Sequence, residues 1–247
     1  MGSAIGALLV AHGHEVLWDP NRRSDATARR AAAAGMTSVE NLLDVDVILS
    51  VCPPHAALDV ARSVQGTRAL VIDANAISPM TARQVGEVVG ARWVDGGIVG
   101  PPPRRAGTTR LYLSGRHALE ASELFAGTSL EPVVLDGSSV AASSLKMAYA
   151  AWTKGSAALL LAALGSARGT GVEDALRAEW KRSQPELDSR LQGAANSAST
   201  KGWRWVGEMN EIAATFASVG LPSGFHEAAA EMFDRAAREK ATEQPGT

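Results

Sequence analysis

The sequence of 247 residues contains a single cysteine, five histidines and only 5% aromatic residues. One cysteine, Cys52, excludes an intrachain disulfide and any metal site built from several thiolates. Such sparse use of cysteine is typical of proteins in the reducing cytosol, so we expect a cytoplasmic location. The histidines and acidic residues do not fall at the spacing of metal ligands, and we therefore predict no metal site.

An excess of charge of one sign is also missing, because 24 basic residues stand against 26 acidic ones. This balance excludes a nucleic-acid-binding protein dominated by phosphate contacts. The longest uninterrupted apolar run, residues 157–164, is far shorter than the ~18–20 residues that cross a bilayer. Residues 2–11 are apolar but lack the basic start of a signal peptide. We expect neither nucleic-acid nor membrane partners.

Short apolar runs alternate with helical patterns in the first half of the chain. Because continuous apolar strands separated by helices are typical of a parallel sheet covered on both faces, we predict an α/β, Rossmann-type domain over residues 1–137. The expected strands are residues 15–18, 46–52, 69–73, 92–95, 110–114 and 132–135. The expected helices are residues 3–12, 24–34, 55–64, 78–89 and 116–126.

The second half shows only helical patterns, and we predict an all-α domain for substrate binding and dimerisation over residues 138–247. Its first helix, residues 141–167, connects the two domains and is too long and apolar for one globule to bury in full. Such a helix favours a subunit interface, so we expect a homodimer. The other expected helices are residues 172–183, 185–195, 201–219 and 224–240.

The start of the chain indicates a dinucleotide-binding unit without its first strand. In such a unit the turn G-x-G-x-x-G joins the first strand to the first helix, and its third glycine permits close packing. Gly2 holds the position of that third glycine, and the two earlier glycines would precede Met1. We therefore expect a truncated N-terminus, a Rossmann sheet that lacks its first strand, and a cofactor contact at Gly2.

The loop after the second strand selects between the two nicotinamide cofactors. An acidic residue at the strand end binds the ribose 2′-hydroxyl of NAD, whereas an arginine accommodates the 2′-phosphate of NADP. Asp19 ends the strand, and the loop continues with Asn21, Arg22, Arg23 and Ser24. Because guanidinium groups match phosphate oxygens, this loop favours NADP over NAD, with a solvated surface loop as the alternative.

Five stretches, spread in order over nearly the whole chain, carry a resemblance to a known family. They are VILSVCPPHAALDVA (47–61), VIDANAISP (71–79), VDGGIVGPPPRRAGTTRLYLSG (94–115), SSLKMAYAAWTKG (143–155) and WVGEMNEIAATFASVGLP (205–222). The chain resembles the 6-phosphogluconate dehydrogenase-like, or β-hydroxyacid dehydrogenase, superfamily. Within it, the chain is most similar to bacterial NAD(P)-dependent oxidoreductases with a C-terminal DUF1932 domain. The resemblance implies hydride transfer between a nicotinamide and a small hydroxyacid-like substrate.

The resemblance also implies roles for particular residues. Lys146, on an apolar helix, matches the lysine that serves as general acid and base. The residues expected to flank the nicotinamide are Val51, Cys52, Pro53, Pro54 and Asn75. The residues expected to hold the substrate are Asp95, Gly96, Gly97, Arg104 and Glu208, and Arg104 suits a carboxylate or phosphate on the substrate.

The chain departs from the family pattern at three places. Ala150 replaces an asparagine, Gly207-Glu208 replaces Lys-Asp, and the substrate loop has no serine between its glycines. Two alternatives therefore stay open. One is an imine or ketone reductase on the same scaffold, against which Lys146 argues because those relatives often lack the lysine. The other is a non-catalytic dimeric binding module, which the missing glycine turn favours.

Overall fold

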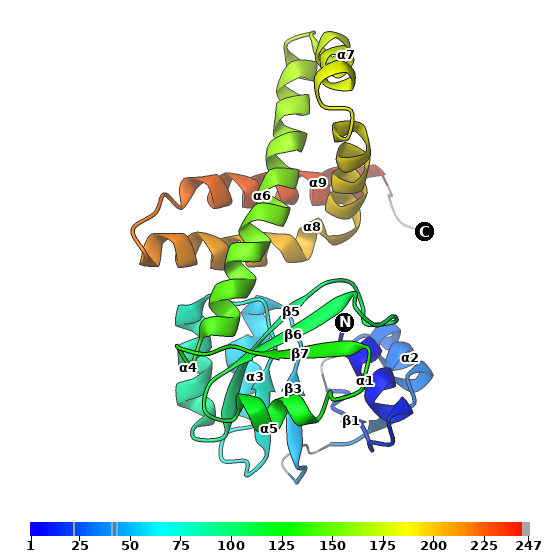
Figure 1. The fold of residues 1–247 in the computed structure, drawn as a ribbon. Helices are drawn as coiled ribbons and strands as arrows, with labels where there is room; N and C mark the ends of the chain where they lie inside the picture. Colours follow the sequence, from blue (N-terminus) through cyan, green and yellow to red (C-terminus); the bar gives the residue numbers. More distant parts are fainter. Residues whose placement is uncertain (22, 41, 43, 244–247) are drawn as a thin grey trace. The chain divides into compact units, whose positions relative to one another are not determined.

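The computed structural model describes residues 1–243 except 22, 41 and 43, with side chains as far as Arg238. Backbone contacts divide the chain into two compact units, Met1–Lys146 and Met147–Thr247. The first unit is α/β and the second is helical (Figure 1). The predicted fold class, a Rossmann-type domain followed by an all-α region with a long connecting helix, is confirmed.

Five strands form the main sheet of the first unit, in the order β3-β4-β5-β6-β7. Neighbouring strands are parallel except β5 and β6, which are antiparallel. The strands are β3 (Val47–Ser50), β4 (Leu70–Asp73), β5 (Trp93–Val99), β6 (Thr109–Ser114) and β7 (Leu130–Val134). A separate parallel pair consists of β1 (Leu17–Trp18) and β2 (Thr37–Ser38).

The two sheets share no strand pairing within the part of the chain that the structure describes. Helix α1 (Gly2–Ala11) buries Ile5, Leu8 and Leu9 in the core of the main sheet, together with side chains of α5 (Ala118–Glu123). This packing fixes the start of α1 next to the main sheet.

Local sequence signals start two helices of this unit at the predicted residues. Ser24 caps α2 (Asp25–Ala33), and Ser78 caps α4 (Pro79–Val89) by accepting a hydrogen bond from the Thr81 N–H at 3.1 Å. Pro79 occupies the first helical position, where an N–H has no intrahelical partner. The chain between β3 and β4 forms the short 3-10 helix η1 (Pro54–Ala56) and then α3 (Ala57–Ser63).

The structure differs from the sequence prediction in two strands of this unit. β5 continues through Gly96 and Gly97, where we expected a loop, because these residues pair with Leu113 and Tyr112 of β6. β2 was not expected, because two exposed residues are too few to show strand alternation.

The second unit contains the rest of α6 (Ala141–Gly169), followed by α7 (Glu173–Ser183), α8 (Leu187–Ser218) and α9 (Gly224–Glu243). We expected two helices where the structure has the single helix α8. The helix continues because Ala194, Ala198 and Gly202 keep one buried face at a spacing of four residues. A Cβ on Gly202 would lie 2.8 Å from the Phe233 carbonyl oxygen, so the glycine permits α8 and α9 to pack closely.

Helix α6 has a property that the sequence analysis missed. By length and composition alone this helix could cross a membrane, which the short apolar run of residues 157–164 did not indicate. A membrane is one environment that would cover such a helix, and the apolar surface of another protein chain is a second one.

Candidate functional site

The predicted cofactor and substrate residues meet at the carboxyl ends of three parallel strands. Residues 51–54 follow β3, Asn75 follows β4, and Asp95 lies within β5. Strand register places Ser50 beside Asp73 and Asp73 beside Asp95, so three polar side chains cross the sheet in one row. In open α/β sheets, ligands bind outside the carboxyl ends of the strands. The carboxyl ends of these three strands are therefore the candidate site.

Asn75 connects two of the segments predicted to face the nicotinamide. Its side-chain oxygen accepts a hydrogen bond from the Cys52 N–H at 2.5 Å, and its side-chain nitrogen donates to Ser50 Oγ at 2.8 Å. The same nitrogen also donates to Asp73 Oδ1. Because Asn75 is buried and its amide makes these bonds, it fixes the loop after β3.

Two ionisable groups in this network keep their protons at neutral pH or close to it. Burial, with a smaller contribution from the nearby Asp95 charge, raises the pKa of the Asp73 carboxyl to about 7, although hydrogen bonds from Asn75 oppose the rise. Burial also raises the pKa of the Cys52 thiol to about 11. A protonated thiol is a poor nucleophile, so Cys52 has no part in covalent chemistry here.

Asp95 holds the start of helix α6. Its Oδ1 accepts a hydrogen bond from Ser143 Oγ at 2.5 Å. Its Oδ2 accepts bonds from the Ser143 N–H at 2.8 Å and from Ser114 Oγ at 3.0 Å. Burial raises the pKa of the Asp95 carboxyl, and these hydrogen bonds oppose that rise. The expected contact of Asp95 with the substrate stays a prediction, and the structure adds hydrogen bonds by which Asp95 anchors the helix bearing Lys146.

Lys146 lies next to β5, one turn into α6. Its Nζ donates a hydrogen bond to the Ile98 carbonyl oxygen at 2.7 Å, and its side chain is half-buried. A Cβ on Gly97 would lie 2.8 Å from the Ala142 carbonyl oxygen and 3.1 Å from the Lys146 Cβ. Gly97 thus lets α6 approach β5 closely, which brings the lysine to the sheet edge.

Gly96 has a similar packing role. A Cβ at this position would lie 3.0 Å from the Asp73 carbonyl oxygen on the neighbouring strand. The two glycines predicted to hold the substrate are therefore the positions where β4, β5 and α6 come closest.

Two of the predicted residues near the N-terminus, Gly2 and Arg23, lie near the loop after β3. A Cβ on Gly2 would make ordinary contact with Val51 at 3.9 Å, so the first residues of α1 lie beside the loop after β3. The positive charge of Arg23 is close enough to lower the pKa of the Cys52 thiol. Asp19 Oδ1 accepts a hydrogen bond from the Asn21 N–H at 2.8 Å. Ser24 caps α2, and Arg22 lies outside the described residues.

The other two predicted substrate residues are Arg104 and Glu208. Arg104 is exposed in the turn between β5 and β6. Glu208 belongs to the helical unit, where it forms an ion pair with Lys154, and both side chains are almost fully buried. The Lys154 Nζ also lies 5.7 Å from the centre of the Trp205 ring. Sequence reasoning missed Lys154, Ser114 and Ser143, because their partners are far away along the chain.

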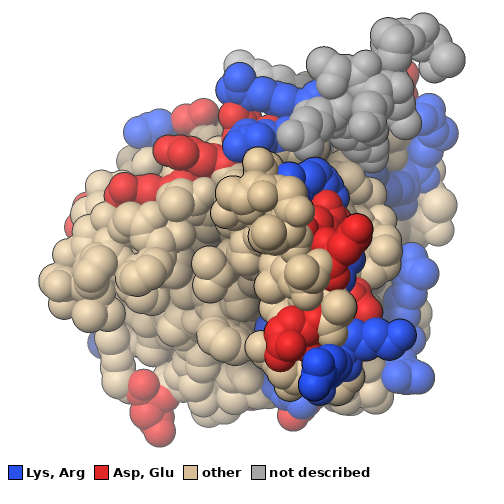
Figure 2. Space-filling model, turned by 90° about the horizontal axis from the view of Figure 1, so that it is seen from above, with Lys and Arg blue, Asp and Glu red and all other residues tan. Residues whose placement is uncertain are grey.

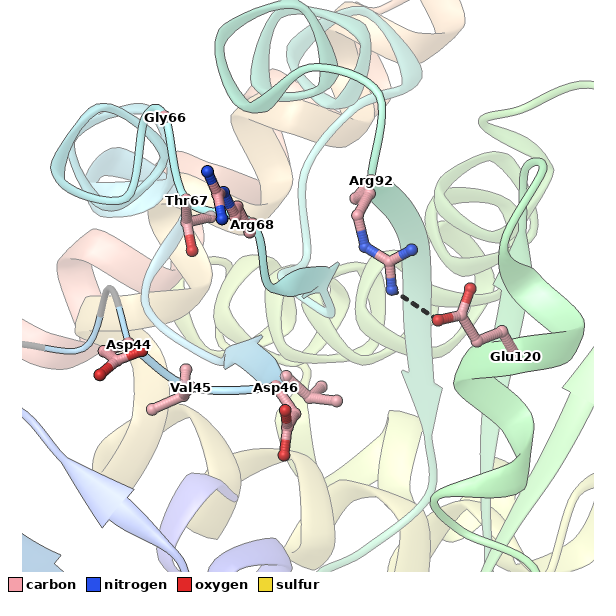
Figure 3. A pocket seen from close by; sticks show the side chains of 9 residues that line it. Asp44, Val45, Asp46, Gly66, Thr67, Arg68, Arg92 and Glu120 are labelled. Carbon is pink, nitrogen blue, oxygen red and sulfur yellow. Dashed lines mark hydrogen bonds and ion pairs between the residues drawn. The ribbon is translucent and has the colours of Figure 1, made fainter.

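A solvent-open hollow of about 740 Å³ lies at the opposite, amino end of the strands (Figure 3). Arg92 and Glu120 form an ion pair in its wall at 2.5 Å. Its lining residues are Asp44, Val45, Asp46, Val47, Gly66, Thr67, Arg68, Arg92 and Glu120. It contains none of the predicted site residues. Among the residues that the structure describes, no group of His, Cys, Asp or Glu is arranged to hold a metal ion.

Comparisons with known proteins match part of the chain to one domain family and to one curated relative. Residues 167–236 match the domain of unknown function DUF1932. A 28.5 kDa protein from the 7S RNA 5′ region of Methanothermus fervidus is 30% identical over 163 residues. That match spans 62% of this chain and 62% of the relative's length.

Solved structures extend the likeness to the whole chain. A conserved hypothetical protein of Sinorhizobium meliloti 1021 is 27% identical with a TM-score of 0.68, covering 100% of this chain and 87% of that one. A conserved protein described as structurally similar to 3-hydroxyacid dehydrogenases is 27% identical with a TM-score of 0.69, covering 98% and 95%.

More distant structures share the fold alone. They include a 3-hydroxyisobutyrate dehydrogenase from Salmonella typhimurium (15% identity, TM-score 0.69, covering 96% of this chain and 91% of that one). They also include a reductive aminase from Aspergillus terreus with NADPH (18%, 0.54, 97% and 90%) and an imine reductase from Myxococcus stipitatus with NAD+ (18%, 0.54, 96% and 90%). The chain thus has the fold of proteins described as similar to 3-hydroxyacid dehydrogenases, and residues 167–236 of its helical half match the DUF1932 domain.

Proposed function

We propose that this protein is an NAD(P)-dependent oxidoreductase that transfers a hydride between a nicotinamide and a small hydroxyacid-like substrate. The observation that carries this proposal is the position of Lys146. Its ammonium is bonded to the backbone of β5, on the strand next to the one whose end bears Asn75. Neighbours of the same fold that hold NADPH or NAD+ support a nicotinamide cofactor.

The residues present fit a dinucleotide. The first N–H groups of α1 carry the partial positive charge of a helix N-terminus, which suits a pyrophosphate. These groups lie beside the loop after β3, because Gly2 contacts Val51. Arg23 adds a full positive charge near the same loop. When bound, the nicotinamide supplies or accepts the hydride, and the segments around Val51 and Asn75 would hold its ring.

Lys146 would act as the general acid and base. In the reducing direction its Nζ gives a proton to the substrate oxygen, and in the oxidising direction it takes that proton back. The hydrogen bond to the Ile98 carbonyl oxygen orients the Lys146 ammonium group. Asp95 holds the helix turn that precedes Lys146. An exposed arginine such as Arg104 would attract a carboxylate or phosphate on the substrate.

The loop after β1 favours NADP over NAD. Asp19, the one acidic residue at the strand end, already accepts a hydrogen bond from the Asn21 N–H. Arg23 is exposed, and so can reach a 2′-phosphate. We expect the protein to act in the cytosol, where NADPH supports reduction.

A screen of substrates tests the proposed reaction. Oxidation of hydroxyacids with NADP+, and reduction of the matching ketoacids with NADPH, would support the proposal. Turnover of imines without any oxidation of alcohols would instead support the reductase alternative, whose fold is also similar to this chain.

We further propose that two copies of the chain associate through the helical unit. Tyr149, Trp152 and Leu159 project from one face of α6, and their exposed fractions are 48%, 71% and 72%. Large apolar side chains exposed at this spacing form a stripe rather than scattered surface residues. On the face shown in Figure 2, acidic and basic side chains are interspersed, and uncharged areas lie between them. A second copy offers the same stripe to a two-fold interface.

Replacing Leu159 by lysine should weaken this dimer. Because a two-fold interface contains the residue twice, we expect the dissociation constant to rise by more than about tenfold. Sedimentation velocity between 1 and about 50 micromolar measures the change. Glu179→Lys, on the exposed surface of α7, is the control and should leave the dimer intact. A wild-type monomer at every concentration, or a protein that stays in solution only with detergent, would contradict the proposal.

A further inference from the structure

Asp73 lies beneath the loop that follows β3, and one hydrogen-bond chain connects the two. Asp73 Oδ1 accepts bonds from the backbone N–H of Asn75, at 3.1 Å, and from its side-chain nitrogen. The side-chain oxygen of Asn75 in turn accepts the bond from the Cys52 N–H. The carboxyl of Asp73 thus sets the orientation of the amide that holds the loop.

The second oxygen of this carboxyl has an apolar environment. Asp73 is 2% exposed, and its Oδ2 is buried without a hydrogen-bond partner among the described residues. A cavity of about 10 Å³ adjoins it, and the side chains that α3 and α4 contribute to its lining are all apolar. They are Ala57, Val60, Ala61, Val85 and Val89.

Among the described residues, the charged groups that act on Asp73 or on the neighbouring Cys52 thiol are Asp95 on β5 and Arg23 in the loop after β1. Cys52 follows β3, and its thiol stays protonated. Asp95 on β5 is a second buried carboxyl group, and its negative charge raises the pKa of Asp73. No lysine or arginine lines the cavity as the structure describes it. An ionised Asp73 would therefore be a buried carboxylate without a counter-ion, which is costly.

We propose that Asp73 is a positioning residue that works as a neutral acid: with its proton it lets Asn75 hold the loop of residues 51–54, and without its proton that loop loosens. The physical reason is that a buried, unpaired carboxylate is relieved by local opening, which lets water reach it and breaks the Asn75–Cys52 bond. Its raised pKa, about 7, puts the change within the physiological range.

The consequence for ligand binding rests on the proposed function, in which this loop contacts the nicotinamide. The protonated fraction of Asp73 falls as the pH rises through about 7, so cofactor affinity should fall in the same direction. Asp73→Asn keeps an acceptor for Asn75 and places an uncharged amide where the acid has its O–H group. This variant should lose the part of the pH dependence of cofactor affinity that Asp73 contributes.

The single cysteine of the chain allows a test without any ligand. Protein labelled with 15N-cysteine gives one backbone amide signal, that of Cys52. We expect this signal to shift with one midpoint near pH 7 in the wild type, and its hydrogen exchange to lose protection above the midpoint. In Asp73→Asn the signal should not titrate. Asp46→Asn, at the exposed start of the neighbouring strand, is the matched control and should titrate like the wild type.

A flat Cys52 signal in the wild type between pH 5 and 9, or a titration that persists in Asp73→Asn, would overturn the inference. If Asp73→Asn does not fold, a wild-type Cys52 signal that stays flat between pH 5 and 9 still overturns the inference.

Titration with NADPH then separates the inference from the proposed function. We expect the ratio of the two dissociation constants, wild type over Asp73→Asn, to rise about tenfold between pH 6 and 8.5, and the cofactor's own ionisation cancels in this ratio. A constant ratio would remove the link between Asp73 and the cofactor. If Cys52 titrates through Asp73 but no nicotinamide nucleotide binds, the proposed function fails while the positioning role stands.

Discussion

Replacing Lys146 by methionine is expected to lower kcat by about 10²–10⁴-fold, the range that one positioned acid or base contributes. Methionine fills a similar volume but cannot transfer a proton. The Ile98 carbonyl oxygen loses its partner, yet it lies where the lysine side chain is only half-buried, so the fold should persist. NADPH affinity should change by less than about twofold, because Lys146 acts on the substrate rather than the cofactor. Steady-state kinetics and a fluorescence titration of the same preparation measure both quantities.

Two further variants give this prediction its controls. Lys146→Arg keeps the positive charge but does not release a proton at neutral pH, so kcat should stay low. Lys181→Met, on the exposed surface of α7, should behave like the wild type. If Lys146→Met turned over substrate at the wild-type rate, the general acid and base would have to be another group.

Replacing Asp95 by alanine is expected to cost about 3 kcal/mol of unfolding free energy, because three buried donors lose their acceptor at about 1 kcal/mol each. Those donors are the N–H and hydroxyl of Ser143 and the hydroxyl of Ser114. In a chain of this size the melting temperature should fall by about 6–12 °C. Thermal unfolding followed by circular dichroism measures the fall. The variant should also lose activity, because the first turn of α6 then no longer fixes Lys146.

Asp136→Ala removes an exposed carboxyl just before α6 and is the matched control for this prediction. Its melting temperature should stay within about 1 °C of the wild type, as is usual for surface substitutions. A similar result for Asp95→Ala would mean that the serine hydrogen bonds contribute little, and that the anchoring role assigned to Asp95 is wrong.

Much of the fold could be predicted because strand and helix patterns are local. The proline and serine at the start of α4 and the apolar runs of β3 and β4 indicate their elements without any knowledge of partners. The register that puts Ser50, Asp73 and Asp95 side by side depends on how separate strands pair. No local pattern reports such pairing.

In the candidate site, too, the sequence predicts residues with a local signal but not the contacts between residues that are far apart in the chain. Lys146 could be singled out from the sequence because it lies on an apolar helix, and lysine is rarely buried without a partner. Asn75 and Asp95 were expected to face the cofactor and the substrate, but nothing in the sequence indicated the hydrogen bonds by which they hold a loop and a helix turn in place. The partners of Asp95 are Ser114 and Ser143, the second of them 48 residues away, and a common residue type at that distance gives no signal in one sequence.

The measurement that tests the central claim most directly is the binding of NADPH and NADH to this chain, followed through nicotinamide fluorescence. The account predicts saturable binding of both nucleotides, with NADPH the tighter. It also predicts that Arg23→Glu weakens NADPH binding by about tenfold or more while NADH changes little, because only NADPH carries the 2′-phosphate. If neither nucleotide binds at millimolar concentration, the edge of the sheet that bears Asn75 and Lys146 is not a nicotinamide site, and the proposed oxidoreductase function is wrong.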